Sequence, residues 1–188
     1  TRRPGRRTGP VTALPEPRRV EHPGEEIEPR VLSEVSEPGR ELRLHLPEGT
    51  DILNGLGAVL REQGINTAGV RLGGGSFKKF SYYTGVEDPT GYRVATFSPP
   101  NFPPLPVTLA IANVMVGMDE EGAPRSHCHA IFLDGEGNKL GGHLIPGECI
   151  IGPGGLVAWA TAGGTAELQA HHDPETNFPL LHPSKAEA

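Results

Sequence analysis

From residue 40 onward, hydrophobic and polar residues alternate along most of the chain, which is the pattern of half-buried β-strands. The clearest case comes first, where Leu42, Leu44 and Leu46 alternate with polar neighbours. The same pattern, bounded by turn-forming residues, predicts further strands at residues 67–72, 76–83, 92–97, 107–118, 127–133, 139–144, 156–162 and 165–170. We therefore expect a sheet that occupies most of the folded region.

Turn-forming residues predict how some of these strands connect. Gly163-Gly164 favours a tight hairpin between the last two strands. Residues 134–138 read Asp-Gly-Glu-Gly-Asn and favour a turn that folds residues 139–143 back against residues 127–133. Strands joined by such short turns run antiparallel.

One segment has helical rather than alternating periodicity. Thr50 or Asp51 can cap its start, and Gly64 stands where a glycine commonly ends a helix. Its apolar residues fall on one face of the helix, at Ile52, Leu53, Leu56, Val59 and Leu60. One main helix beside many strands predicts an α+β domain, a compact and mostly antiparallel sheet with one helix packed on it.

The first 39 residues form a Pro/Arg-rich N-terminal arm that differs from the rest of the chain. Seven prolines interrupt charged sequence here, and such a segment buries too little apolar surface to fold alone. We expect it to be extended or disordered until something orders it, with at most one short strand at residues 30–35. The alternative is that the arm packs along a neighbouring subunit.

Charge is divided unevenly between this arm and the body. Residues 1–19 hold six arginines and one glutamate, a net +5, and the whole chain of 188 residues is −6, so the other 169 residues carry −11. A basic arm on an acidic body allows nucleic-acid contact by the arm alone. The candidate DNA-binding residues are Arg2, Arg3, Arg6 and Arg7.

Composition excludes several classes of protein. No stretch approaches the roughly 18–20 consecutive apolar residues of a transmembrane helix, and no secretory signal is visible. Cys128 and Cys149 are the only cysteines, too few for a disulfide scaffold. Aromatic residues make up 5% of the chain, which disfavours binding of single strands by base stacking. We therefore expect a soluble, cytoplasmic protein with no membrane partner.

Three histidines carry the candidate chemistry. His127 and His129 stand two residues apart on a predicted strand, so both imidazoles project from the same face. The turn at residues 134–138 brings His143 near this pair. Three converging imidazoles suit Zn²⁺ and leave its fourth tetrahedral position open. We therefore predict that these three histidines bind zinc or another divalent metal, although either ring of the pair could instead bond a backbone carbonyl.

Other residues are candidates for supporting roles. Asp134, Glu136 and Glu148 are near enough in sequence to orient the histidine rings, and the sequence does not choose among them. Glu148 is also the candidate general acid/base if the protein is an enzyme. Arg71, beside the glycine turn at residues 73–75, is the candidate anion-binding residue, with ordinary solvent exposure as the simpler interpretation.

The histidine block resembles the plant and prokaryote conserved domain (PPC domain) family, whose bacterial members show His-x-His, an Asp-Gly turn and Gly-Gly-His-Leu in that order. This chain has His127-Cys128-His129, then Asp134-Gly135, then Gly141-Gly142-His143-Leu144. The resemblance spans about residues 40–182 and leaves residues 183–188 as a C-terminal tail. It implies a trimeric α+β domain with a metal site, usually zinc, at the three histidines.

Family members are commonly described as DNA-binding, because plant relatives join the domain to an AT-hook. The hook core is Arg-Gly-Arg-Pro, whereas the arm here reads Arg2-Arg3-Pro4-Gly5-Arg6-Arg7. Our main hypothesis is a trimeric metal-binding domain with a DNA-binding or regulatory role through its arm. The alternative is a metal-dependent enzyme acting on a small carboxylate-bearing molecule near the histidines, at a subunit boundary. A third interpretation is that the metal only stabilises the trimer.

Overall fold

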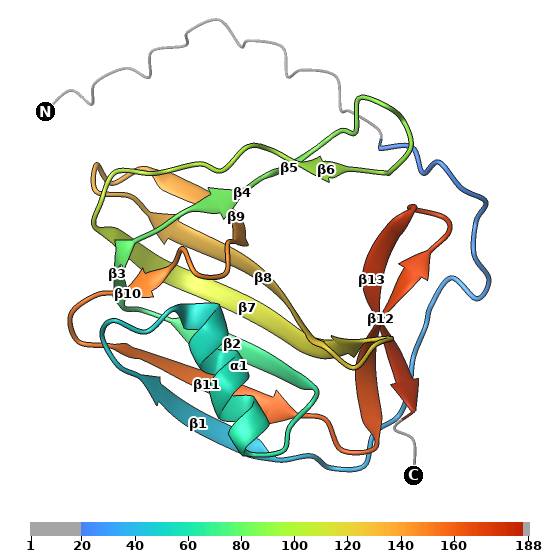
Figure 1. Cartoon of the computed structure of the whole chain (residues 1–188), viewed down its shortest axis with the longest axis horizontal. Coiled ribbons are helices and arrows are strands. Elements are labelled where there is room, and N and C mark those ends of the chain that lie inside the picture. The colour runs from blue at the N-terminus through green and yellow to red at the C-terminus, as the bar shows by residue number, and fades with distance from the viewer. Residues whose placement is uncertain (1–19, 186–188) are drawn as a thin grey trace, which may run out of the picture.

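The computed structural model describes residues 20–185 of the chain (Figure 1). These residues form one α-helix and thirteen β-strands. In chain order the elements are β1 (Glu41–Leu46), α1 (Ile52–Glu62), β2 (Ala68–Gly73), β3 (Ser76–Lys79), β4 (Tyr82–Tyr83), β5 (Gly85–Val86), β6 (Thr96–Phe97), β7 (Val107–Asp119), β8 (Pro124–Leu133), β9 (Lys139–Leu144), β10 (Ile150–Ile151), β11 (Leu156–Ala162), β12 (Ala166–Asp173) and β13 (Phe178–Lys185).

The predicted helix is present as α1 and is capped as expected. The side chain of Asp51 accepts a hydrogen bond from the backbone N–H of Asn54 at 3.0 Å. Gly64 follows the helix with a φ of +64°, a left-handed conformation that glycine adopts without strain. Within residues 20–185, no helix is long and apolar enough to cross a membrane.

Among the described residues, eleven strands form one sheet whose main path runs β1-β11-β2-β7-β8-β9-β4. Helix α1 lies over one face of this sheet (Figure 1), and the core between them includes Leu72, Val114 and Phe132, which are almost inaccessible to solvent. Side chains alternate across each strand, so every second residue points away from the helix. We call this side the outer face, and its exposed residues include Arg71, Asn113, His129 and Trp159. The α+β architecture is therefore confirmed.

The C-terminal β12–β13 hairpin stands away from the main path of the sheet (Figure 1). β12 pairs with β13 along its length and meets β7 through two parallel pairs, Gln169–Met118 and Ala170–Asp119. The hairpin predicted at Gly163-Gly164 is wrong, because β1 and β2 already occupy both edges of β11. The chain therefore leaves β11 and forms its hairpin with the next segment instead.

β13 was not expected as a strand and runs to Lys185. Its sequence contains Pro179 and Pro183, and proline is confined to the edges of sheets because it cannot donate a backbone hydrogen bond. β13 satisfies this rule, since within the described residues it pairs with β12 alone.

Two other predicted strands are shorter than expected. Residues 76–83 divide into β3, which pairs with β7 and β10, and β4, which pairs with β9, so the chain moves from one part of the sheet to another. Of residues 92–97 only β6 is a strand. The carboxylate of Asp88 accepts hydrogen bonds from the backbone N–H groups of Thr90 and Arg93. These bonds stabilise a loop at residues 88–93, where the sequence had predicted that a strand would begin.

Residues 20–39 contain no strand, so the short strand predicted at residues 30–35 is not formed. This segment runs along the outside of the domain beside the β12–β13 hairpin (Figure 1). The backbone N–H of Glu37 donates to the Thr165 side chain at 3.0 Å, and the Ser36 hydroxyl accepts from the N–H of Gly164 at 3.1 Å. The described part of the arm is therefore held by its own chain.

Candidate metal centre

Strands β8 and β9 place the three predicted histidines together on the outer face. His129 and His143 are direct cross-strand partners, and His127 lies two residues before His129 on the same side of β8. Cys128 between them is 3% exposed and points into the core. Burial raises the pKa of the Cys128 thiol to about 12, so it remains protonated at neutral pH.

The ring nitrogens are arranged as a metal site requires. The Nε2 atom of His129 lies 3.0 Å from Nε2 of His127 and 3.2 Å from Nε2 of His143. The three rings can offer ligand nitrogens that all lie within 4.8 Å of one another. Two imidazoles on a tetrahedral Zn²⁺ have nitrogens about 3.3 Å apart, given Zn–N distances near 2.0–2.1 Å. The donor set therefore fits zinc in both chemistry and spacing.

Local sequence explains why β9 returns beside β8. The carboxylate of Asp134 accepts hydrogen bonds from the backbone N–H groups of Glu136 and Asn138, which fixes the predicted turn. The Asp134 carboxylate therefore stabilises the turn at residues 134–138, and its hydrogen bonds among the described residues go to this turn rather than to a histidine ring. At Gly142, a Cβ atom would stand 2.3 Å from the carbonyl oxygen of Tyr83, so only glycine lets β4 lie against β9.

The surroundings keep two of the rings neutral. Partial burial, and then the proximity of His129, lower the pKa of His127. Burial first, and then the proximity of His129 and His127, lower the pKa of His143 to about 4. Metal binds only the neutral form of imidazole, so both rings are ready for binding at neutral pH without losing a proton.

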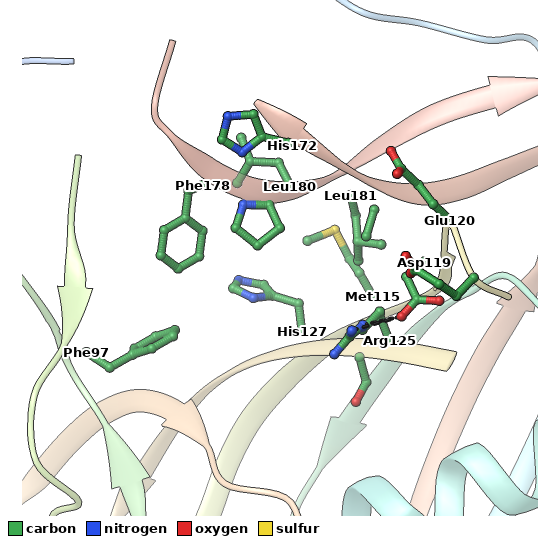
Figure 2. Close-up of a pocket in the computed structure, with 14 residues that line it drawn as sticks. Phe97, Met115, Asp119, Glu120, Arg125, His127, His172, Phe178, Leu180 and Leu181 are labelled. Atoms are coloured by element: carbon green, nitrogen blue, oxygen red, sulfur yellow. Dashed lines mark hydrogen bonds and ion pairs between the residues drawn. The ribbon is translucent and has the colours of Figure 1, made fainter. Parts of the chain in front are cut away.

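A cavity of about 700 Å³ adjoins the histidines, between the outer face and the β12–β13 hairpin. Figure 2 shows His127 rising from β8 into this cavity, with Phe178 and Leu181 of β13 facing it. Half of the lining residues have apolar side chains: Phe97, Met115, Ala170, Phe178, Pro179, Leu180 and Leu181. This composition is typical of small-molecule sites, in which a few polar groups project among apolar ones.

Phe97 connects the cavity wall to the histidines. Its ring meets the His143 ring edge to face, with centroids 4.9 Å apart, and lies 6.1 Å from the ring of Phe178. Neither Phe97 nor Phe178 was assigned a role from the sequence. Phe97 had one local signal, its place in the strand predicted at residues 92–97, and Phe178 had none. Both residues come near the histidines only through the tertiary fold.

Charged residues surround one side of the cavity. The guanidinium of Arg125 pairs with the carboxylate of Asp119 at 2.8 Å, and Figure 2 shows this pair at the cavity wall. Glu120 pairs with His171 at 2.9 Å. His172 also lines the cavity, although it was not among the predicted site residues.

The other predicted site residues lie elsewhere. The carboxylate of Glu148 pairs with the Lys79 ammonium at 2.8 Å and is not part of the cavity lining. Arg71 is exposed on the outer face, two strands from His129. The four arm arginines, Arg2, Arg3, Arg6 and Arg7, fall outside the described residues.

Comparison with known proteins identifies the family. The model of the Plants and Prokaryotes Conserved (PCC) domain matches residues 33–161 of the chain, which is more than half of its length. The chain belongs to this family. The match includes the histidine block and confirms the resemblance read from it. No curated protein matches the chain significantly.

Several solved structures share this PCC fold. A metal-containing protein from Archaeoglobus fulgidus is 19% identical with a TM-score of 0.64, and the match covers 81% of this chain and 98% of that one. A plant- and prokaryote-conserved protein from Pyrococcus horikoshii is 20% identical with a TM-score of 0.61, covering 83% and 100%. A candidate DNA-binding protein from Ralstonia eutropha JMP134 is 24% identical with a TM-score of 0.60, covering 74% and 88%. At these identities the likeness establishes the fold.

Proposed function

We propose that this PCC domain binds a divalent metal ion, zinc, through His127, His129 and His143, and that the metal centre binds a small molecule in the adjoining cavity. The observation that carries the proposal is the convergence of the three Nε2 atoms at the edge of that cavity. The metal-containing relative from Archaeoglobus fulgidus supports it. When bound, zinc supplies a Lewis acid that polarises a carbonyl or lowers the pKa of a coordinated water.

The chain's own residues would shape this site. Phe97 packs on the edge of the His143 ring and limits its rotation. Phe178 and Leu181 exclude water from the apolar end of the cavity, and a drier site strengthens the attraction between a charged ligand and its partners. The side chains of Arg125 and Asp119 neutralise each other at the wall.

Metal titration of the full chain tests the proposal. We expect one zinc ion per chain, bound with measurable heat and removed by a chelator. His129→Gln should abolish binding, whereas His172→Gln, a histidine of the same cavity outside the triad, should retain it. Unchanged zinc binding in His129→Gln would contradict the proposal. Bound metal at 100 times its dissociation constant should stabilise the fold by about 2.7 kcal/mol.

We further propose that the domain assembles as a homotrimer through its outer face. Four large apolar side chains are exposed there: Ile111, Met115, Ile131 and Trp159. Ile111 and Ile131 are direct cross-strand partners, so they form a continuous patch beside the histidines. Exposed apolar patches of this kind mark interaction surfaces. In such an assembly a neighbouring subunit would lie close to the metal centre.

A second candidate function is DNA binding through the basic arm. It is favoured by the +5 charge of residues 1–19 on a −11 body, and the Ralstonia eutropha relative is also described as a candidate DNA-binding protein. Arg2, Arg3, Arg6 and Arg7 would contact phosphates or enter the minor groove. Affinity for duplex DNA should then fall steeply with salt. Deletion of residues 1–19 should abolish it, and intact binding by the truncated chain would exclude this role for the arm.

A further inference from the structure

Arg71 and Asn113 lie in the same cross-strand row as two of the histidines. The sheet register pairs Arg71 with Asn113, Asn113 with His129, and His129 with His143. Directly paired residues project from the same face of a sheet. The row therefore passes from an arginine, across an amide, to the candidate metal centre, entirely on the outer face.

Both polar side chains in this row are available to a ligand. Within residues 20–185, neither the Arg71 guanidinium nor the Asn113 amide makes a hydrogen bond or an ion pair, and both residues are exposed. They line a second cavity of about 710 Å³ together with Trp159 and Met115. Met115 lines both this cavity and the cavity at His127, so the two hollows adjoin at that side chain.

The charge of this row is opposite to that of the body. It contains Arg71 and, beyond Trp159, a second arginine, Arg43, but no carboxylate. Arg43 already makes a cation–π contact, because its guanidinium lies 5.8 Å from the centre of the Trp159 ring. Glu41 is the one acidic residue in the lining of the second cavity, and it stands on β1, beyond β11 from Arg71. Within residues 20–185, Arg71 is therefore the cation of this row that has no partner in the protein.

We infer that Arg71 and Asn113 bind the carboxylate of a small molecule whose other end is held at the metal centre, an inference that rests on the function proposed above. Neighbouring strands lie about 4.8 Å apart, so the backbone of Asn113 is about 5 Å and that of Arg71 about 10 Å from His129. The guanidinium fork matches a carboxylate through two parallel hydrogen bonds, and the amide adds a further donor. The ligand class is a short dicarboxylate, with one carboxylate at the metal and one at Arg71.

The experiment uses the full chain loaded with Co²⁺, whose visible spectrum reports on the metal's ligands. Saturated dicarboxylates of increasing length, from malonate to adipate, are titrated in turn, with butyrate as a monocarboxylate reference. We expect affinity to peak at an intermediate length and to exceed that of butyrate by about tenfold, since a hydrogen-bonded charge pair is added. Equal affinities for butyrate and every dicarboxylate would overturn the inference.

Substitutions distinguish a loss of carboxylate binding at Arg71 from a loss of metal binding at the histidines. Arg71→Ala should weaken the best dicarboxylate by about tenfold while leaving the Co²⁺ spectrum and butyrate affinity unchanged. Arg43→Ala is the matched control, because it removes an arginine of the same row that already stacks on Trp159, and it should have no effect. Equal losses in the two variants would overturn the role of Arg71. Failure of the wild-type chain to bind Co²⁺ would instead overturn the proposed function, and this inference with it.

A neighbouring subunit is the remaining alternative partner for Arg71. Arg71→Glu distinguishes it, because reversal of the charge should lower dicarboxylate affinity further than Arg71→Ala without changing the sedimentation of the protein. If Arg71→Glu alters the oligomeric state and Arg71→Ala leaves dicarboxylate affinity unchanged, the guanidinium serves assembly and the inference is overturned.

Discussion

His127 and His143 share an electrostatic environment, which bears on the pH range of the metal binding proposed above. Burial and the neighbouring imidazoles disfavour a positive charge on His127 and His143. An imidazole that is already neutral does not have to release a proton when a metal binds. The same environment acts on stability, because the unfolded chain has no such penalty and its histidines titrate near pH 6.5.

We therefore predict that the metal-free protein loses stability between pH 6.5 and about pH 4. Above this window the His143 ring is neutral in both states and contributes nothing to the pH dependence. Inside it, the unfolded chain binds a proton at His143 and the folded chain does not, so the free energy of unfolding falls as pH falls. Urea unfolding in chelator at several pH values measures this. His143→Gln should show a shallower pH dependence than wild type, and identical slopes would contradict the assignment.

At the residue scale, the sequence predicted that His127, His129 and His143 converge, but it predicted only part of their surroundings. The His-x-His spacing, the turn at residues 134–138 and the position of His143 are local features, so they could be read directly. Phe97 and Asn113 approach the histidines through strands that are distant along the chain, and no local pattern places them there. Glu148 was selected for nearness in sequence, whereas its pairing with Lys79 depends on β3.

At the element scale, the position of His143 in the candidate metal centre depends on how closely β4 lies against β9. We predict that Gly142→Ala destabilises the fold by about 1–3 kcal/mol, because the new Cβ would stand 2.3 Å from the Tyr83 carbonyl oxygen. Zinc affinity should fall as well, since His143 is the next residue. Thermal unfolding and zinc titration measure the two effects. Gly69→Ala on β2 is the control, because its new Cβ would have no atom within 4 Å.

The arm is fastened to the hairpin that forms the cavity wall. Glu175, in the turn between β12 and β13, accepts hydrogen bonds from the Arg30 side chain and from the backbone N–H of Ile27 at 3.0 Å, and it also contacts His22. These contacts, led by the Arg30 hydrogen bond, lower the pKa of Glu175 to about 2. The ionised carboxylate thus gives stability that is fully present above pH 4.5 and is lost only as pH falls toward 2.

We predict that Glu175→Gln releases residues 20–30 from the hairpin. Neutralising the carboxylate removes the charge-assisted hydrogen bonds from Arg30 and leaves the segment with few other contacts. Backbone hydrogen exchange at Ile27 should become faster, and trypsin should cleave at Arg30 sooner than in wild type. Glu25→Gln, which alters an exposed residue of the same segment, should change neither rate. Unaltered exchange in Glu175→Gln would show that other contacts hold the arm.

Helices and strands were predicted correctly where the hydrophobic periodicity lies within one segment. The prediction failed where a strand's position depends on which other strand it pairs with. The helix α1 and the long strands β7, β8 and β9 have clear periodicity, and their positions were predicted to within a few residues. The partner of β12 could not be read from Gly163-Gly164, because that choice depends on β11 being enclosed by β1 and β2. The short strands β5 and β10 are two residues long and are defined only by their partners.

At the scale of the whole molecule, the outer face carries both the candidate metal centre and exposed apolar side chains, and these two features favour opposite degrees of solvent exposure. A ligand needs access to the histidines, whereas Ile111 and Ile131 gain free energy by being covered. Assembly through this face satisfies both if a neighbouring subunit covers the isoleucines and leaves the cavity at His127 open. The acidic body does not oppose such contact, because the row from Arg43 to His143 carries no carboxylate.

This arrangement predicts that Ile131→Glu separates the subunits without unfolding them. Ile131 is 56% exposed in the single chain, so a glutamate there is tolerated by the monomer but would bury a charge in an assembly. Analytical ultracentrifugation should show three times the chain mass for wild type and a monomer for the variant, with unchanged circular dichroism. Val35→Glu, which is 92% exposed on the arm, should remain trimeric. A monomeric wild type, or a trimeric Ile131→Glu, would show that the outer face is not the assembly surface.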